Sequence, residues 1–86
     1  MIEVILILET ADDIVNHIFN SSDGLEDFLK TINLNEYEYT SILFLVDGEC
    51  HHNMSTIYRA RYIDKISKEE EQKLYTKLKK PLPYYD

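Results

Sequence analysis

Two long runs of apolar residues dominate the hydropathy pattern, at residues 2–9 and 37–46. Apolar residues occupy odd and even positions alike in both runs, as at Val4, Ile5 and Leu6. A strand that is apolar on both faces is typical of the middle of a sheet covered on two sides. We therefore expect two central strands, with the Asp47-Gly48 dipeptide forming a tight turn after the second.

Three segments repeat their apolar residues at helical spacing. Residues 14–20 carry one such stripe, and Thr10 can cap a helix that begins there. Residues 25–32 place apolar residues at i, i+3, i+4 and i+7. Ser67 opens a capping box for a last helix over residues 68–80.

A third strand is expected over residues 54–63, where two sets of side chains alternate. One face would carry Thr56, Tyr58, Ala60 and Tyr62, and the other Ile57, Arg59, Arg61 and Ile63. The element order is then β-α-α-β-β-α. Strands one and two should be parallel through a right-handed crossover, and strands two and three antiparallel. These elements predict a single small α/β (α+β) domain over residues 1–86, with a three-stranded mixed sheet packed with helices and an extended tail at 81–86.

The predicted core follows from the helical and strand periodicities of these segments. It consists of Val4, Leu6, Leu8, Ile14, Ile18, Phe28, Ile42, Phe44 and Ile57.

Length and composition narrow the class of protein. A chain of 86 residues has room for one core, so function should reside on its surface. The single cysteine, Cys50, fits a reducing compartment. The apolar run near Met1 is too short for a signal peptide or a membrane span. We expect a soluble cytoplasmic protein that does not contact a membrane.

Charge is segregated along the chain. Residues 1–49 hold eleven acids and one base, whereas residues 50–86 hold five acids and eight bases, and the whole chain has a net charge of -7. Such asymmetry is typical of a chain that presents a charged face to a partner.

The acidic half contains the candidate partner-binding residues. Several of its acids fall in predicted first turns of helices, where acids are favourable without a partner, so a merely solvated face is the alternative. The Glu36–Tyr39 segment mixes acids with tyrosines, which suits contact with a basic protein surface. The candidates are Asp12, Asp13, Asp23, Glu26, Asp27, Glu36, Tyr37, Glu38 and Tyr39.

A second hypothesis is a nucleic-acid binder. Arg59 and Arg61 alternate with tyrosines, and single-stranded nucleic acid is held by stacking beside guanidinium groups. Lysines from Lys73 to Lys80 would add charge to this surface. The negative net charge disfavours attraction to phosphate, so structural packing and internal charge pairing are the expected roles of these residues.

A third hypothesis is a small metal-dependent enzyme at Cys50, His51 and His52. Cys50 and His52 can meet across one pleat, but a zinc site needs three or four ligands, and the usual paired spacing is missing. No Gly-rich phosphate loop or paired-carboxylate signature is present either. We expect neither a metal nor a cofactor, and no catalytic residues.

The sequence therefore favours a small acidic protein-binding module rather than an enzyme. The residue usage is biased toward AT-rich codons, which suggests a low-GC bacterium, its phages or a similar virus. A concrete form is a phage or mobile-element inhibitor, of the anti-CRISPR kind, that occludes the nucleic-acid groove of a host nuclease. A homodimer is the second interface prediction. The thin apolar stripe of the last helix, Leu74, Tyr75 and Leu78, with Tyr84 and Tyr85 beyond it, suggests a self-association surface. Lys73, Lys77 and Lys80 would meet the acidic half of a neighbouring copy.

Overall fold

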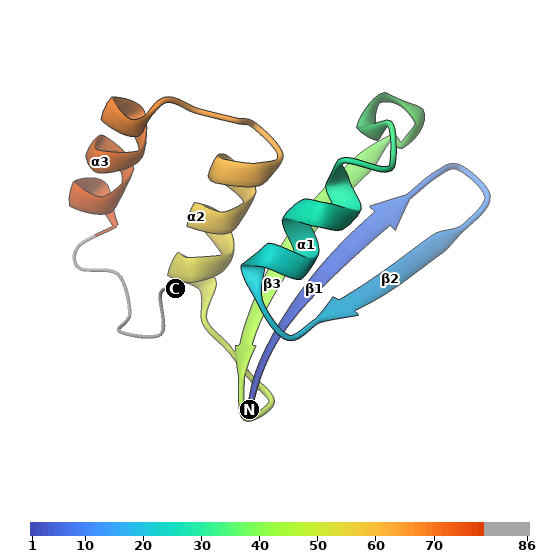
Figure 1. The fold of residues 1–86 in the computed structure, drawn as a ribbon, viewed down its shortest axis with the longest axis horizontal. Coiled ribbons are helices and arrows are strands. Elements are labelled where there is room, and N and C mark those ends of the chain that lie inside the picture. The colour runs from blue at the N-terminus through green and yellow to red at the C-terminus, as the bar shows by residue number, and fades with distance from the viewer. Residues whose placement is uncertain (79–86) are drawn as a thin grey trace.

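The computed structural model of the protein describes residues 1–78. The expected tail at 81–86, and with it Tyr84 and Tyr85, lies outside the described residues, as does Lys80. The elements in chain order are β1 (Ile2–Glu9), β2 (Ile14–Phe19), α1 (Ser22–Leu29), a short 3-10 helix η1 (Leu34–Glu36), β3 (Tyr39–Val46), β4 (Glu49–Cys50), α2 (His52–Tyr62) and α3 (Lys68–Lys77). They form a small compact α+β domain, as expected in class (Figure 1).

The four strands form one antiparallel sheet in the order β2-β1-β3-β4. The predicted three-stranded mixed sheet with a parallel pair is therefore wrong. An extra strand, β2, returns the chain to the end of the sheet where β1 begins. Helix α1 then carries the chain back, so β3 runs opposite to β1 (Figure 1).

The predicted helix over residues 14–20 is the edge strand β2. A tight turn precedes it, in which the Thr10 N–H donates to the Asp13 carbonyl (2.9 Å) and the Asp13 N–H donates to Thr10 Oγ1 (3.2 Å). The apolar positions of this segment fit both a helical stripe and an alternation. Its β-branched residues Ile14, Val15 and Ile18 favour the strand.

The predicted strand over residues 54–63 is the helix α2. Its buried face includes Met54, Ile57 and Tyr58, which follow the spacing i, i+3, i+4 of a helical stripe. The period-2 interpretation of this segment is wrong because it followed the Tyr-Arg alternation and overlooked this stripe. Arg59 and Arg61 accordingly lie on a helix and not on a strand.

Three local predictions are confirmed. The helix expected at residues 25–32 is present as α1, three residues earlier, and it begins at a cap in which Ser21 Oγ accepts from the Gly24 N–H (3.3 Å). Ser67 caps the last helix as expected, with Oγ accepting from the Glu70 N–H (3.2 Å) and donating to Glu70 Oε1 (3.1 Å). Asp47 and Gly48 have φ angles of 51° and 83°, the left-handed pair that a two-residue hairpin turn requires.

The core lies between one face of the sheet and the helices. Its buried members are Val4, Leu6, Leu8, Leu25, Ile42, Phe44, Met54, Ile57 and Tyr58. Six of the nine predicted core residues are among them, and Phe28 is half-buried against them. Ile14 and Ile18 are 61% and 60% exposed, because β2 turns these two side chains to the opposite face of the sheet.

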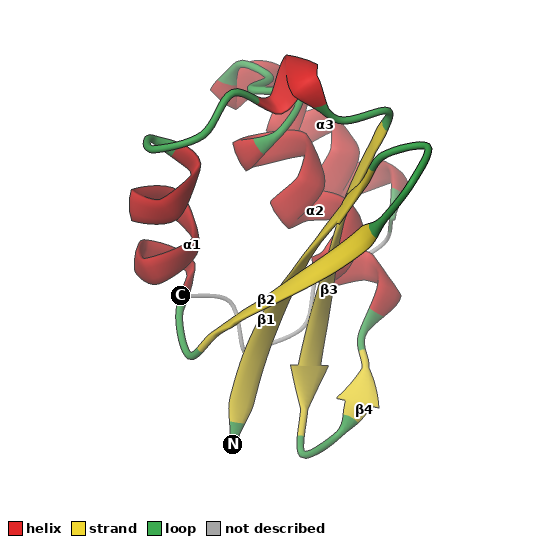
Figure 2. Cartoon of the chain, turned by 90° about the vertical axis from the view of Figure 1, so that its right-hand side faces the viewer, coloured by secondary structure: helices red, strands yellow, loops and turns green. Residues whose placement is uncertain are grey.

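That opposite face has no helix on it among the described elements. Ile5 and Ile7 of β1 and Leu43 and Leu45 of β3 lie there, half-buried by their neighbours and outside the core cluster. Figure 2 views the sheet from its β2 edge, with α1 beside it and α2 and α3 behind. Contrary to the expectation that both central strands are covered on two sides, no helix within residues 1–78 covers this second face. No helix within residues 1–78 is long and apolar enough to cross a membrane.

Candidate functional site: the acidic surface

All seven predicted partner-binding acids are exposed. Asp12 and Asp13 occupy the turn between β1 and β2, not the first turn of a helix. Asp23, Glu26 and Asp27 lie on α1, Glu36 lies in η1, and Glu38 comes directly before β3. None of the seven carboxylates forms an ion pair with a described residue.

Five acids collect where β1 ends and where β2 and β3 begin. We call this group, Glu9, Asp12, Asp13, Glu36 and Glu38, the acidic end. Strand pairing brings them together, because Glu9 lies opposite Ile14 on one side and Tyr39 on the other. The Glu38 N–H also donates to the Glu9 carbonyl (2.8 Å).

Arg59 of α2 reaches β3 one residue beyond Tyr39. Its guanidinium donates to the Thr40 carbonyl, and its Nε lies 3.9 Å from Asp64 Oδ2. Arg59 is thus already engaged by β3 and by an acid outside the acidic end. The acidic end keeps an excess of negative charge.

The two predicted tyrosines have different environments. Tyr37 is half-buried and packs against the core cluster. Tyr39 is 67% exposed and lies beside Glu9 in the sheet, at the border of the acidic end.

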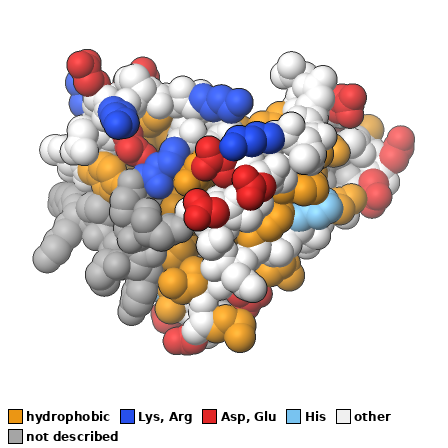
Figure 3. Space-filling model, in the orientation of Figure 1, with side chains coloured by type: hydrophobic (Ala, Val, Ile, Leu, Met, Phe, Trp, Pro, Cys, Tyr) orange, Lys and Arg blue, Asp and Glu red, His pale blue; other side chains and the backbone are white. Residues whose placement is uncertain are grey.

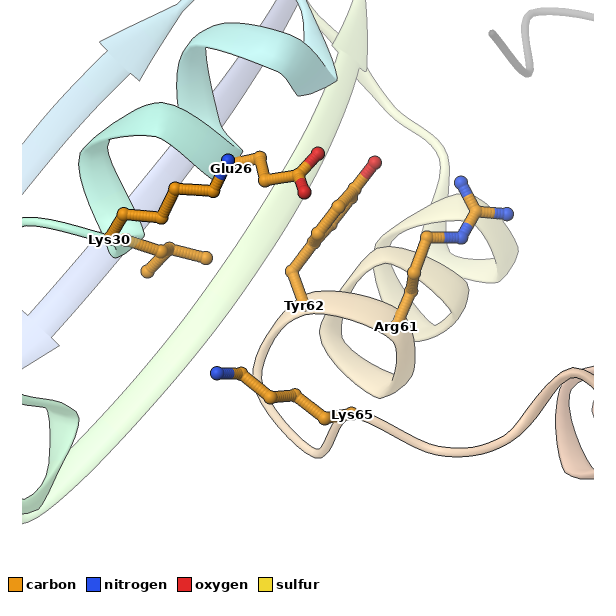
Figure 4. Close-up of a pocket in the computed structure, with 6 residues that line it drawn as sticks. Glu26, Lys30, Arg61, Tyr62 and Lys65 are labelled. Carbon is orange, nitrogen blue, oxygen red and sulfur yellow. The ribbon is translucent and has the colours of Figure 1, made fainter.

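The acids of α1 face a different environment. Glu26 lines a groove of about 420 Å³ together with Leu29, Lys30, Arg61, Tyr62 and Lys65. Figure 4 shows Tyr62 standing between Glu26 of α1 and Arg61 of α2. Acidic and basic side chains are intermixed on this helical side of the molecule (Figure 3). The α1 acids therefore lie on a surface of mixed charge, unlike the acidic end.

Arg61 holds α3 against α2. Its Nε donates to Glu71 Oε1 (2.6 Å) and its NH2 group donates to the Tyr75 hydroxyl (3.1 Å). Burial alone would lower the pKa of Arg61, but its hydrogen bonds with Glu71 and Tyr62 and the charge of Glu71 outweigh burial and raise it. The guanidinium carbon also lies 5.7 Å from the Tyr62 ring centre. The positive charge of Arg61 is therefore paired with Glu71 inside the fold.

The apolar stripe of α3 also packs inside the fold. Leu74, Tyr75 and Leu78 pack against the core cluster. The stripe that suggested a self-association surface therefore contacts the chain's own core. Of the lysines in the homodimer prediction, Lys73 and Lys77 are exposed.

Cys50 and His52 lie close together, as their spacing allowed, with 3.8 Å between Sγ and Nδ1. The ring of His51 packs instead at the edge of Phe44, with 6.1 Å between ring centres. Within residues 1–78, no three His, Cys, Asp or Glu side chains gather closely enough to hold a metal ion. The cluster thus offers a thiol–imidazole pair, and His51 lies apart from it.

Two further acids were missed from the sequence. Glu3 and Glu9 lie near the two ends of β1, on the sheet face that no described helix covers. The sequence did contain a signal for them, because Glu3 and Glu9 occupy odd positions of the strand and so share a face with Ile5 and Ile7.

No protein-family model matches this chain, and neither does any curated protein or solved structure.

Proposed function

We propose that this chain is a small protein-binding module whose acidic end captures a basic surface of another protein. The observation that carries the proposal is the acidic end itself: five carboxylates from two stretches of the chain, residues 9–13 and 36–38, without an ion pair to any described residue. Such a concentration of unpaired charge speeds the encounter with an oppositely charged partner.

A nucleic-acid-binding surface of a host protein, such as a defence nuclease, is the basic target that we propose. Groups that bind phosphate are basic and open to solvent, so a carboxylate cluster can occupy the same site. Occlusion of that site would make the chain an inhibitor of the phage or mobile-element kind. This form of the proposal draws on residue usage and charge.

The nucleic-acid alternative has less support. Arg59 and Arg61 contact Thr40, Asp64, Glu71 and Tyr75 within the fold. A phosphate backbone would also meet repulsion at the acidic end. The metal-enzyme alternative has a pair, Cys50 and His52, where a zinc site needs at least three protein ligands.

Affinity capture from lysates of low-GC bacteria, with identification by mass spectrometry, tests the proposal. The wild type is compared with a variant carrying Asp12→Lys, Asp13→Lys, Glu36→Lys and Glu38→Lys. A matched control makes the same change of charge elsewhere, with Asp23→Lys, Asp27→Lys, Glu49→Lys and Glu69→Lys, all at exposed positions.

We expect the wild type and the control to capture the same protein, one with a basic surface, and the acidic-end variant to lose it. Equal capture by all three chains, or loss with the control alone, would contradict the role of the acidic end.

A further inference from the structure

One apolar face of the sheet is left uncovered by residues 1–78, and we call it the open face. Its apolar members are Ile5, Ile7, Ile14, Ile18, Tyr39, Leu43 and Leu45. Ile14, Ile18 and Tyr39 are each at least 60% exposed. None of the seven belongs to the core cluster or packs against it.

Strand register makes the open face continuous. Ile5 lies opposite Ile18 on one side and opposite Leu43 on the other, which gives an apolar row across three strands. Isolated exposed apolar side chains are ordinary on a protein surface, whereas a contiguous patch marks a binding site. A strand face of this composition is normally covered by another layer of structure.

Charge on the open face limits what can cover it. Glu3 and Glu9 lie on this face and are half-buried, and neither forms an ion pair with a described residue. Every Lys and Arg within residues 1–78 belongs to α1, α2 or α3 or to the segments beside them. The open face therefore carries two carboxylates and no Lys or Arg from residues 1–78.

This charge pattern argues against a second copy of the chain as the occupant. Two open faces stacked on each other would bring Glu3 and Glu9 against the same carboxylates of the other copy. Half-buried like charges without a base repel each other and lose hydration. A complementary occupant supplies cations at both ends of β1 and apolar side chains between them.

We propose that the open face docks a protein partner whose apolar patch is flanked by Lys or Arg side chains. The proposal rests on the proposed function, in which the partner is a basic protein. It extends that function, because the row Tyr39–Glu9–Ile14 joins the open face to the acidic end. A single partner can thus first contact the carboxylates of the acidic end and then cover the apolar side chains of the open face.

A defined probe tests the chemistry of this face. It is a synthetic peptide of alternating Leu and Lys residues, titrated into isotope-labelled protein and followed by the chemical shifts of the backbone amides. A peptide with Glu in place of Lys is the matched probe. We expect saturable shifts at Ile5, Ile18 and Leu43 with the Lys peptide only.

Variants separate the open face from the rest of the sheet. Ile14→Lys with Ile18→Lys should weaken binding of the Lys peptide by at least about tenfold. Val15→Lys is the control, because Val15 is 40% exposed on the same strand but faces the other side of the sheet. Glu3→Gln with Glu9→Gln should weaken binding severalfold and reduce its dependence on salt.

Three results would overturn the proposal: no saturable shift with the Lys peptide, shifts confined to α1 and α2, or equal binding of the Glu peptide. Sedimentation that shows a dimer dissociated by Ile18→Lys would also overturn it, because the occupant would then be a second copy. If the lysate partner is lost with the acidic-end variant but kept with Ile14→Lys and Ile18→Lys, the proposed function stands and this inference fails.

Discussion

Phe44 of β3 and Tyr58 of α2 pack edge to face, with ring centres 5.2 Å apart and ring planes at 82°. Both side chains are buried, at 0% and 1% exposure. Such aromatic pairs prefer this geometry and contribute beyond the area that they bury. This pair joins the sheet to the helical layer, and it is present because residues 52–62 form a helix.

Phe44→Ala should therefore lower the free energy of unfolding by about 3–5 kcal/mol, since it leaves a cavity at the centre of the core. A domain of this size has little stability to spare, so unfolding is an expected outcome. Denaturant unfolding followed by circular dichroism measures the loss. Tyr39→Ala, at an exposed site, should change stability by no more than about 0.5 kcal/mol. A melting temperature of Phe44→Ala near that of the wild type would contradict the central position of β3.

The hydroxyl of Ser55 takes the place of a strand partner for β3. Its Oγ accepts from the Phe44 N–H (2.7 Å) and donates to the His51 carbonyl (3.2 Å). Ser55→Ala should cost about 1–3 kcal/mol, because the buried Phe44 N–H then lacks an acceptor. Thr56→Ala is the matched control: its hydroxyl bonds the His52 carbonyl at an exposed position, so about 0.5 kcal/mol or less is expected. Equal losses in the two variants by chemical denaturation would count against this account.

Tyr75 links stability to alkaline pH. Burial raises the pKa of Tyr75, and the charge of Glu71 adds to that rise, while the nearby Arg61 opposes it. The neutral phenol is therefore favoured in the folded chain. Its contribution is complete below the ordinary tyrosine pKa of about 10 and is lost as the pH rises through the folded-state pKa. Melting curves above pH about 10 should show a smaller loss for Tyr75→Phe than for the wild type. Tyr39→Phe should behave as the wild type, and identical pH profiles for all three chains would refute the linkage.

Metal binding at Cys50 and His52 can be tested directly. Two ligands from the described residues do not complete a zinc site, so zinc and a chelator should both leave the melting temperature unchanged. Thermal unfolding with and without each reagent measures this. A rise of several degrees with zinc that Cys50→Ser removes would restore the metalloprotein hypothesis.

The strands β1 and β3 were predictable because their apolar runs are long and bounded by polar residues. What the sequence could not specify is whether both faces are covered. An apolar residue such as Ile5 has the same local pattern whether it faces a helix or a partner. Coverage depends on the number of layers, which a single chain does not encode in its periodicity.

The two wrong element assignments have a common cause. Residues 14–20 and 54–63 fit both periods, so local pattern could not decide between helix and strand. The first segment forms a strand, which its β-branched residues favour. The second forms a helix, which buries the stripe Met54, Ile57 and Tyr58. The site prediction depended less on these errors, because the acids of turns and helix ends reach solvent in either case. The grouping of Glu9 with Asp12 and Glu38 needed the strand pairing.

The salt dependence of the association rate tests the central claim, that the acidic end captures a basic partner. Stopped-flow association with the captured partner would compare the wild type, the acidic-end variant and the charge-matched control. A fourth variant, Lys73→Glu with Lys77→Glu, tests whether the lysines of α3 bind the partner instead. We expect the rate for the wild type and the control to fall as salt rises, and the acidic-end variant to be slower at low salt, with a weaker dependence. If the acidic-end variant associates as fast as the wild type while the lysine variant loses binding, the account is wrong.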